Sequence, residues 1–98
     1  MNKFLVSYYD IKIKKKVHAL VIPKGKYVNL ENFTSKATSA EIVGLMKGIS
    51  TVAKKIGISS IDNGGFRTLS NVGENGGQEV PHLHFHIIGG EKIGRMVQ

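Results

Sequence analysis

Cysteine is absent from this chain, and so is any long apolar run. Without cysteine the protein has no disulfide, no zinc site built on thiolates and no thiol nucleophile. No stretch is long and apolar enough to span a membrane, and the start of the chain lacks the apolar region that a signal peptide needs. We therefore expect a cytoplasmic protein without a membrane partner.

Acidic residues are also scarce. Seven Asp and Glu residues stand against 14 Lys and Arg, and the net charge of +7 favours anionic ligands such as nucleotides or nucleic acids. Part of this charge is concentrated in one run, made of Lys12, Lys14, Lys15 and Lys16. No aromatic residues alternate with these lysines to stack on bases, so a solvated hairpin turn is favoured over a nucleic-acid surface.

The apolar pattern predicts a single α+β domain over residues 1–98, with an antiparallel sheet of about four to five strands and one long helix packed on it. Runs of branched and aromatic residues predict the strands, and apolar residues at three- and four-residue steps predict the helix. Thr38 with Glu41 predicts a capping box at the start of that helix, and Gly57 predicts its end. The expected elements are strands at 3–11, 16–23, 66–71 and 80–89, a helix at 39–56, a turn at 62–65 and a loop at 72–79.

Three of the four histidines occur at alternate positions, in PHLHFHII at 81–88. Side chains alternate between faces in a strand, so His82, His84 and His86 are expected on one face and the apolar residues between them on the other. Three interpretations are open at this point. The first is a polar, solvent-facing strand. The second is a metal site with two ligands in a His-x-His pair and a third from His86 or His18. In the third, one neutral imidazole attacks phosphorus while the others position the target.

A glycine-rich loop precedes the histidines. Gly73, Gly76 and Gly77 lie in NVGENGGQEV, where backbone amides without a neighbouring side chain can approach an anion closely. No carboxylate occurs at a comparable position on the histidine strand to complete a metal site. Together with the basic charge, the loop favours phosphate chemistry over a metal, and we expect neither a metal nor a cofactor.

The segment GGQEVPHLHFHIIGG at 76–90 resembles the signature of the histidine triad (HIT) superfamily, His-φ-His-φ-His-φ-φ with φ apolar, at every position from His82 to Ile88. Its flanking residues are similar to the branch of histidine triad nucleotide-binding (HINT-like) proteins. Asp10-Ile11, VHALVIPK at 17–24 and GGFRTLSNVGENGGQ at 64–78 resemble further parts of that family. The resemblance covers nearly the whole chain and implies a nucleotidyl hydrolase or transferase.

By this resemblance, His84 attacks the α-phosphorus of a nucleoside monophosphate derivative and forms a nucleotidyl-histidine that water resolves. His82 is implied to orient His84 through its backbone carbonyl, His86 to contact a phosphate oxygen, and His18 to complete a hydrogen-bonded relay. The rest of the nucleotide site is implied to consist of Asp10 at the ribose, and of Asn71, Gly77, Gln78 and Glu79 near the phosphate and leaving group. For Asp10, a hydrogen bond within the hairpin is the alternative role.

The resemblance further implies a purine nucleotide ligand of AMP type, cleavage of a phosphorus–nitrogen bond, and a homodimer formed by joined sheets and packed long helices. The sequence departs from the family pattern in three places. It begins at the strand that follows a base-binding segment in relatives, it has Glu79 where some relatives have serine, and its tail is short. A nucleotide-binding module with little turnover and a metal-dependent hydrolase therefore stay as alternatives.

Overall fold

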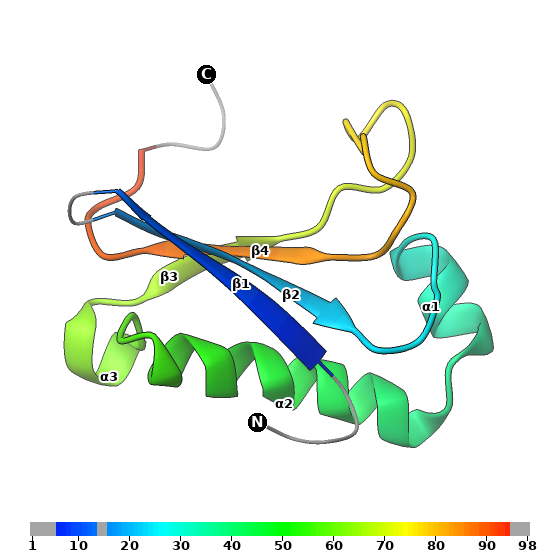
Figure 1. Cartoon of the computed structure of the whole chain (residues 1–98), viewed down its shortest axis with the longest axis horizontal. Coiled ribbons are helices and arrows are strands. Elements are labelled where there is room, and N and C mark those ends of the chain that lie inside the picture. The colour runs from blue at the N-terminus through cyan, green and yellow to red at the C-terminus, as the bar shows by residue number, and fades with distance from the viewer. Residues whose placement is uncertain (1–5, 14–15, 95–98) are drawn as a thin grey trace.

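The structure is a computed structural model that describes residues 6–13 and 16–94 (Figure 1). Of residues 6–13 and 62–63 it describes the backbone alone. Part of the expected lysine turn, at 14–15, and the expected strand start, at 3–5, lie outside the described residues. The elements in chain order are β1 Val6–Ile13, β2 Lys16–Pro23, α1 Leu30–Lys36, α2 Ser39–Lys55, α3 Ser60–Asn63, β3 Phe66–Leu69 and β4 Phe85–Gly89.

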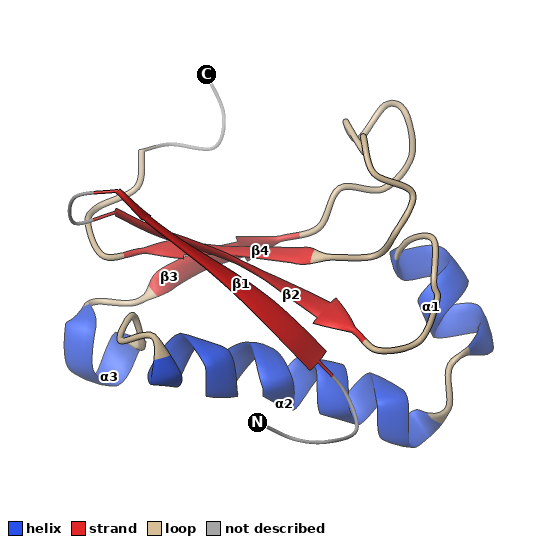
Figure 2. Ribbon diagram, in the orientation of Figure 1, coloured by secondary structure: helices blue, strands red, loops and turns tan. Residues whose placement is uncertain are grey.

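The described chain forms two layers, with α2 packed along one face of a four-stranded antiparallel sheet (Figure 2). The strand order is β1-β2-β4-β3, so β2 and β4 are central and β3 is an edge strand. The predicted α+β class and the antiparallel sheet are confirmed. Among the described helices, none is long and apolar enough to cross a bilayer.

Alternation along the two central strands separates the core from the site. Val17, Ala19 and Val21 of β2 and Phe85 and Ile87 of β4 are buried, while the residues between them are half-buried. The buried side chains form one cluster with those of α2, which are Leu45, Ile49, Val52 and Ala53. Burial against α2 therefore fixes which face of β2 and β4 carries the core, and it leaves the alternate residues on the opposite face.

Helix α2 begins and ends where the sequence predicts. The Thr38 side chain accepts a hydrogen bond from the Glu41 N–H at 3.1 Å, and the Glu41 carboxylate accepts one from the Thr38 N–H at 2.9 Å. At the other end Gly57 adopts a φ of 82°, and the Gly57 and Ile58 N–H groups donate to the carbonyls of Lys54 and Ala53. The capping box and the glycine stop are both confirmed.

Two short helices are not predicted by the sequence pattern. Helix α1 has only two apolar residues packed on the core, Leu30 and Phe33, and this single step is too short to predict a helix. Its N-cap is Asn29, which accepts from the Asn32 N–H. The predicted turn at 62–65 is wrong in its first half, because those residues end helix α3. Gly64 then stops α3 in the left-handed conformation, with a φ of 84°.

The predicted histidine strand at 80–89 begins late, at Phe85. Val21 pairs with Phe85, so continuing the ladder would bring the chain towards Pro23, which has no N–H to donate. The Leu83 N–H donates instead to the carbonyl of Tyr27, at 2.7 Å. Alternation persists without the ladder, since Leu83 is buried and His84 is half-buried. The predicted strand at 66–71 likewise ends early, at Leu69.

Candidate functional site

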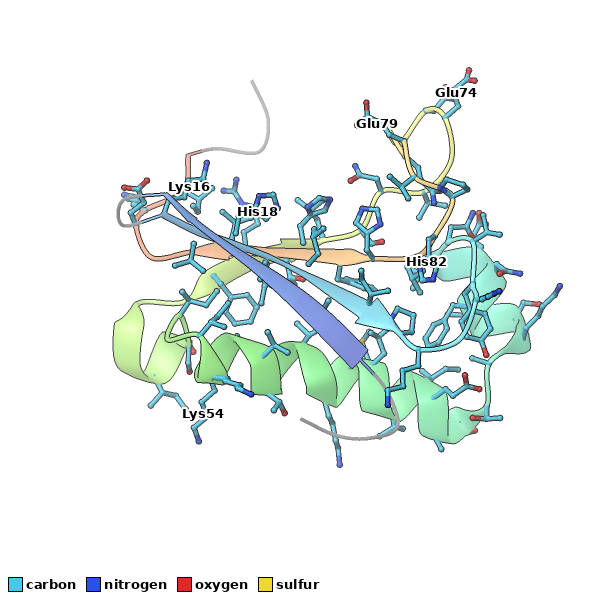
Figure 3. All side chains as sticks on the ribbon, viewed as in Figure 1. Lys16, His18, Lys54, Glu74, Glu79 and His82 are labelled. Carbon is cyan, nitrogen blue, oxygen red and sulfur yellow. The ribbon has the colours of Figure 1, made fainter. Side chains whose placement is uncertain are left out.

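The histidine face is the sheet face opposite α2, where β2 and β4 run side by side (Figure 3). The register pairs Leu20 of β2 with His86 of β4, and His18 with Ile88. His18 and His86 therefore lie diagonally across two neighbouring strands. The distance from His18 Nε2 to His86 Nδ1 is 2.9 Å, and the ring centroids are 5.1 Å apart.

His84 lies next to this pair, with its ring centroid 5.1 Å from that of His86 and the two planes at 69°. His84 Nδ1 is 2.8 Å from the carbonyl oxygen of His82. Because a carbonyl only accepts, Nδ1 carries the proton in this hydrogen bond, and a neutral His84 has its lone pair on Nε2. The backbone of His82 thus prepares Nε2 of His84 as a base or nucleophile.

His82 is held in a similar way, since its Nδ1 lies 3.1 Å from the carbonyl oxygen of Leu83. A pocket of about 380 Å³ opens beside the two rings, lined by Leu20, Ile22, Val80, His82 and His84. Its walls are mainly aliphatic. The pocket therefore offers an apolar surface directly against the imidazole whose Nε2 is unprotonated.

Burial lowers the pKa of His86 below its ordinary value of 6.5, and the nearby His84 and His18 rings lower it further. His86 is thus neutral at neutral pH. In the His18–His86 hydrogen bond one ring donates and the other accepts, which requires that at least one of them is neutral. The lowered pKa of His86 meets this requirement.

The same pKa shift predicts how stability depends on pH. An unfolded chain protonates His86 at about pH 6.5, before the folded chain does, so the free energy of unfolding should decrease as the pH falls below that value. The decrease should level off once the folded protein is protonated too. Denaturant titrations over a pH series would measure the slope, and His86→Asn should reduce it. An equal slope in the variant would exclude His86 as its source.

The glycine loop lies next to the histidines, and several of its amides donate hydrogen bonds within it. The Gly77 N–H donates to the carbonyl of Glu74, the Gly73 N–H donates to the Gln78 side chain, and the Asn71 amide donates to the carbonyl of Gly76. Gly73 and Gly77 have φ values of 70° and 79°, which the loop shape requires. In this conformation the amides of Gly73 and Gly77 hold the loop, and the expected phosphate cradle stays a prediction.

Glu79, another expected site residue, lies at the outer end of the loop near Glu74, and both side chains point away from the sheet (Figure 3). The backbone of Asp10 pairs with that of Ala19 in the β1–β2 hairpin, but its side chain lies outside the described residues. A second pocket, of about 440 Å³, is lined by Val28, Gly73, Glu74, Gly77, Gln78, Glu79 and Pro81. The structure thus brings the four histidines together and leaves Glu79 at the rim.

The chain matches the HIT domain family over residues 2–93. It belongs to the HIT family. It is 44% identical over 92 residues to a 13.2 kDa HIT-like protein of Azospirillum brasilense, a match covering 94% of this chain and 73% of that one. Among solved structures, it is similar to a histidine triad protein from Clostridium difficile, with 31% identity and a TM-score of 0.73 over 97% of this chain and 80% of that one. A HIT family hydrolase from Clostridium thermocellum is 28% identical, with a TM-score of 0.72 over 100% and 83% of the two chains.

Two residues of this HIT domain that sequence reasoning does not identify hold the histidine segment by its backbone. The Ser70 hydroxyl donates to the carbonyl of His84 at 2.7 Å, and the carbonyl of Tyr27 accepts from the Leu83 N–H. Tyr27 lies outside the quoted motifs, and the resemblance over 64–78 gives no role to Ser70. Both contacts depend on how the chain runs past the ends of β2 and β3, which the local sequence does not encode.

Within residues 16–94, no three His, Cys, Asp or Glu side chains converge as ligands of one metal ion. The short His18–His86 distance argues against a metal ion bound by both of these nitrogens. Two nitrogens that share one proton at 2.9 Å cannot both direct lone pairs at the same cation. In this HIT protein, His18 and His86 are therefore arranged as a hydrogen-bonded pair, whereas His82 and His84 are bonded to backbone carbonyls.

Proposed function

We propose that this protein hydrolyses the phosphorus–nitrogen bond of nucleoside phosphoramidates of AMP type, through a nucleotidyl-His84 intermediate. One observation carries the proposal. His84 Nδ1 donates to the carbonyl of His82, so Nε2 holds the lone pair of a ring that lines the pocket. That is the protonation state that a neutral imidazole nucleophile needs.

The reaction balances in two steps. Nε2 of His84 attacks the α-phosphorus, the phosphorus–nitrogen bond breaks, and the amine leaves with a proton taken from the surroundings. Water then attacks the nucleotidyl-histidine, which releases the nucleoside monophosphate and restores neutral His84. When His18 Nε2 donates to His86 Nδ1 across the 2.9 Å contact, Nε2 of the neutral His86 carries an N–H for a phosphate oxygen on which charge develops.

Membership of the HIT family supports a hydrolase, because a structural neighbour with 28% identity is a HIT family hydrolase. The net charge of +7 supports an anionic ligand. The aliphatic walls of Leu20, Ile22 and Val80 are suited to an uncharged ring or chain attached to the phosphorus. Gly77 and Gln78 line the second pocket, on the glycine loop, and Asn71 and Asp10 are kept in the proposal as nucleotide ligands, Asp10 at the ribose.

The test is turnover of a fluorogenic adenosine phosphoramidate by the wild-type protein, measured with and without a chelator. We expect hydrolysis to AMP and free amine at the same rate in both samples. Calorimetric titration with AMP accompanies the assay. AMP binding without turnover would replace the proposal by a nucleotide-binding module, and loss of turnover in chelator would replace it by a metal-dependent hydrolase.

We include a homodimer in the proposal, formed by joined sheets and packed long helices. Two features support it. β3 is an edge strand of the described sheet, and α2 exposes Val43 and Met46, one turn apart and 51% and 46% accessible. Light scattering on the purified chain measures its mass in solution, and a monomer at the concentration of the activity assay would remove the dimer from the proposal.

A further inference from the structure

Both N–H groups and the oxygen of the Gln78 side-chain amide have hydrogen-bond partners in the protein. Its Nε2 donates to the carbonyl of Val28 at 2.7 Å and to that of Val80 at 3.0 Å, and its Oε1 accepts from the Gly73 N–H at 2.9 Å. The Gln78 backbone N–H donates in turn to the carbonyl of Gly73, at 3.0 Å. Gln78 therefore joins the two ends of the glycine loop through Gly73, and it binds the loop to the segments that contain Val28 and Val80.

One of those segments leads directly to the nucleophile. The carbonyl of Val80, which accepts from Gln78, also accepts from the His82 N–H at 2.8 Å, in a tight turn centred on Pro81. The carbonyl of His82 is the group that orients His84. The hydrogen bonds thus run from Gln78 through the turn to the carbonyl that sets the tautomer of His84.

The other segment is anchored to the helix layer. The carbonyl of Tyr27 accepts from the Leu83 N–H at 2.7 Å, and the adjacent carbonyl of Val28 accepts from Gln78. Tyr27 is fixed at its far end, because its hydroxyl donates to Glu41 at 2.7 Å and its ring packs edge-on against Phe33. Two neighbouring carbonyls therefore tie the histidine segment and the loop to the start of α2.

We propose that Gln78 is a positioning residue that sets the orientation of His84 by joining the glycine loop, the 80–82 turn and the Tyr27–Val28 segment. The assignment rests on the proposed function. It differs from a direct role of Gln78 in nucleotide binding, because both N–H groups and the oxygen of its amide have partners in the protein. Its effect on the reaction is transmitted through the backbone of His82.

Gln78→Glu tests the proposal, since it keeps the side-chain shape and replaces the donating NH₂ group by an oxygen. We expect kcat to fall by about 10- to 100-fold, because about one ångström of misplacement costs about 100-fold, while KM changes by less than about threefold. Nitrogen NMR of the His84 ring should show the Nδ1–H tautomer in the wild type and a mixture in the variant. Backbone amides at 72–83 should exchange faster with solvent. The matched control is Glu74→Gln, at the outer end of the same loop, which should leave all these quantities unchanged (Figure 3).

A rise in KM with an unchanged His84 tautomer and unchanged exchange would overturn the proposal in favour of direct ligand binding. If Gln78→Glu does not fold, Gln78→Met removes the same hydrogen bonds without adding charge and is measured in the same way. If the wild type turns over no phosphoramidate, the proposed function fails separately, and the His84 tautomer and amide exchange of the variants still decide whether Gln78 positions the ring.

Discussion

Replacing His84 by alanine should abolish phosphoramidate turnover, lowering kcat by at least about 10⁴-fold, as expected when a covalent nucleophile is removed. In the proposed reaction the ring Nε2 is the atom that bonds to phosphorus, and alanine offers no substitute. Rapid quenching with labelled substrate and mass spectrometry should detect a nucleotidyl adduct on wild-type His84 and none on the variant. Stability should change little, by less than about 1 kcal/mol, because the ring is half-buried on the face away from the core.

His82→Ala is the informative companion to this variant. The His84 ring is oriented by the backbone carbonyl of residue 82, which alanine retains, so kcat should fall much less, by about tenfold. A much larger loss of kcat in His84→Ala than in His82→Ala therefore distinguishes a nucleophile from a residue that acts through its main chain. Equal losses in the two variants, or an adduct that persists in His84→Ala, would contradict the assignment of His84 as nucleophile.

The histidine site could be predicted from the sequence because its main determinant is local. Alternation along 82–89 places every second residue on one face, and it persists even though the ladder of β4 starts only at Phe85. His18 was placed with the triad by the family resemblance, and the β2–β4 register brings it within 2.9 Å of His86. The alternating pattern and the family motif were therefore sufficient to predict that these histidines lie together.

The support of that site could not be predicted, because it depends on contacts between distant segments. Ser70 binds the carbonyl of His84 from 14 positions away, and Gln78 binds the carbonyl of Val28 from 50 positions away. No periodicity carries such information. The glycine loop shows the same limit, since its composition predicts close approach to an anion, whereas the amides of Gly73 and Gly77 bind partners within the loop.

The hydrogen bond between Tyr27 and Glu41 shifts the pKa of both side chains. The Thr38 N–H and the Tyr27 hydroxyl lower the pKa of Glu41 by stabilising its carboxylate, and the hydrogen bond to Glu41 raises the pKa of Tyr27. Glu41 thus caps α2 and holds Tyr27 with the same side chain. One acidic residue thereby links the helix start to the segment that anchors Leu83.

Leu83→Ala should destabilise the fold more than any change on the histidine face. Leu83 is 1% exposed and lies between His82 and His84, with its side chain in the core cluster. Truncating a buried leucine costs about 2 to 5 kcal/mol, a large share of the roughly 5 to 15 kcal/mol that stabilises a typical domain. Urea denaturation should show the midpoint moving to lower urea concentration.

Leu69→Ala provides the matched control, because it removes the same atoms from a half-buried position on β3, which pairs with His86. Its cost should be about 1 kcal/mol, as is usual for a single substitution outside the core. A cost for Leu83→Ala as small as that of Leu69→Ala would show that the histidine segment is not held through the core. The Leu83 and His84 variants should also differ from each other, because adjacent positions face opposite sides of the strand. Truncation at 84 removes the proposed nucleophile and leaves the fold intact. Truncation at 83 removes the buried side chain that keeps His82 and His84 in place.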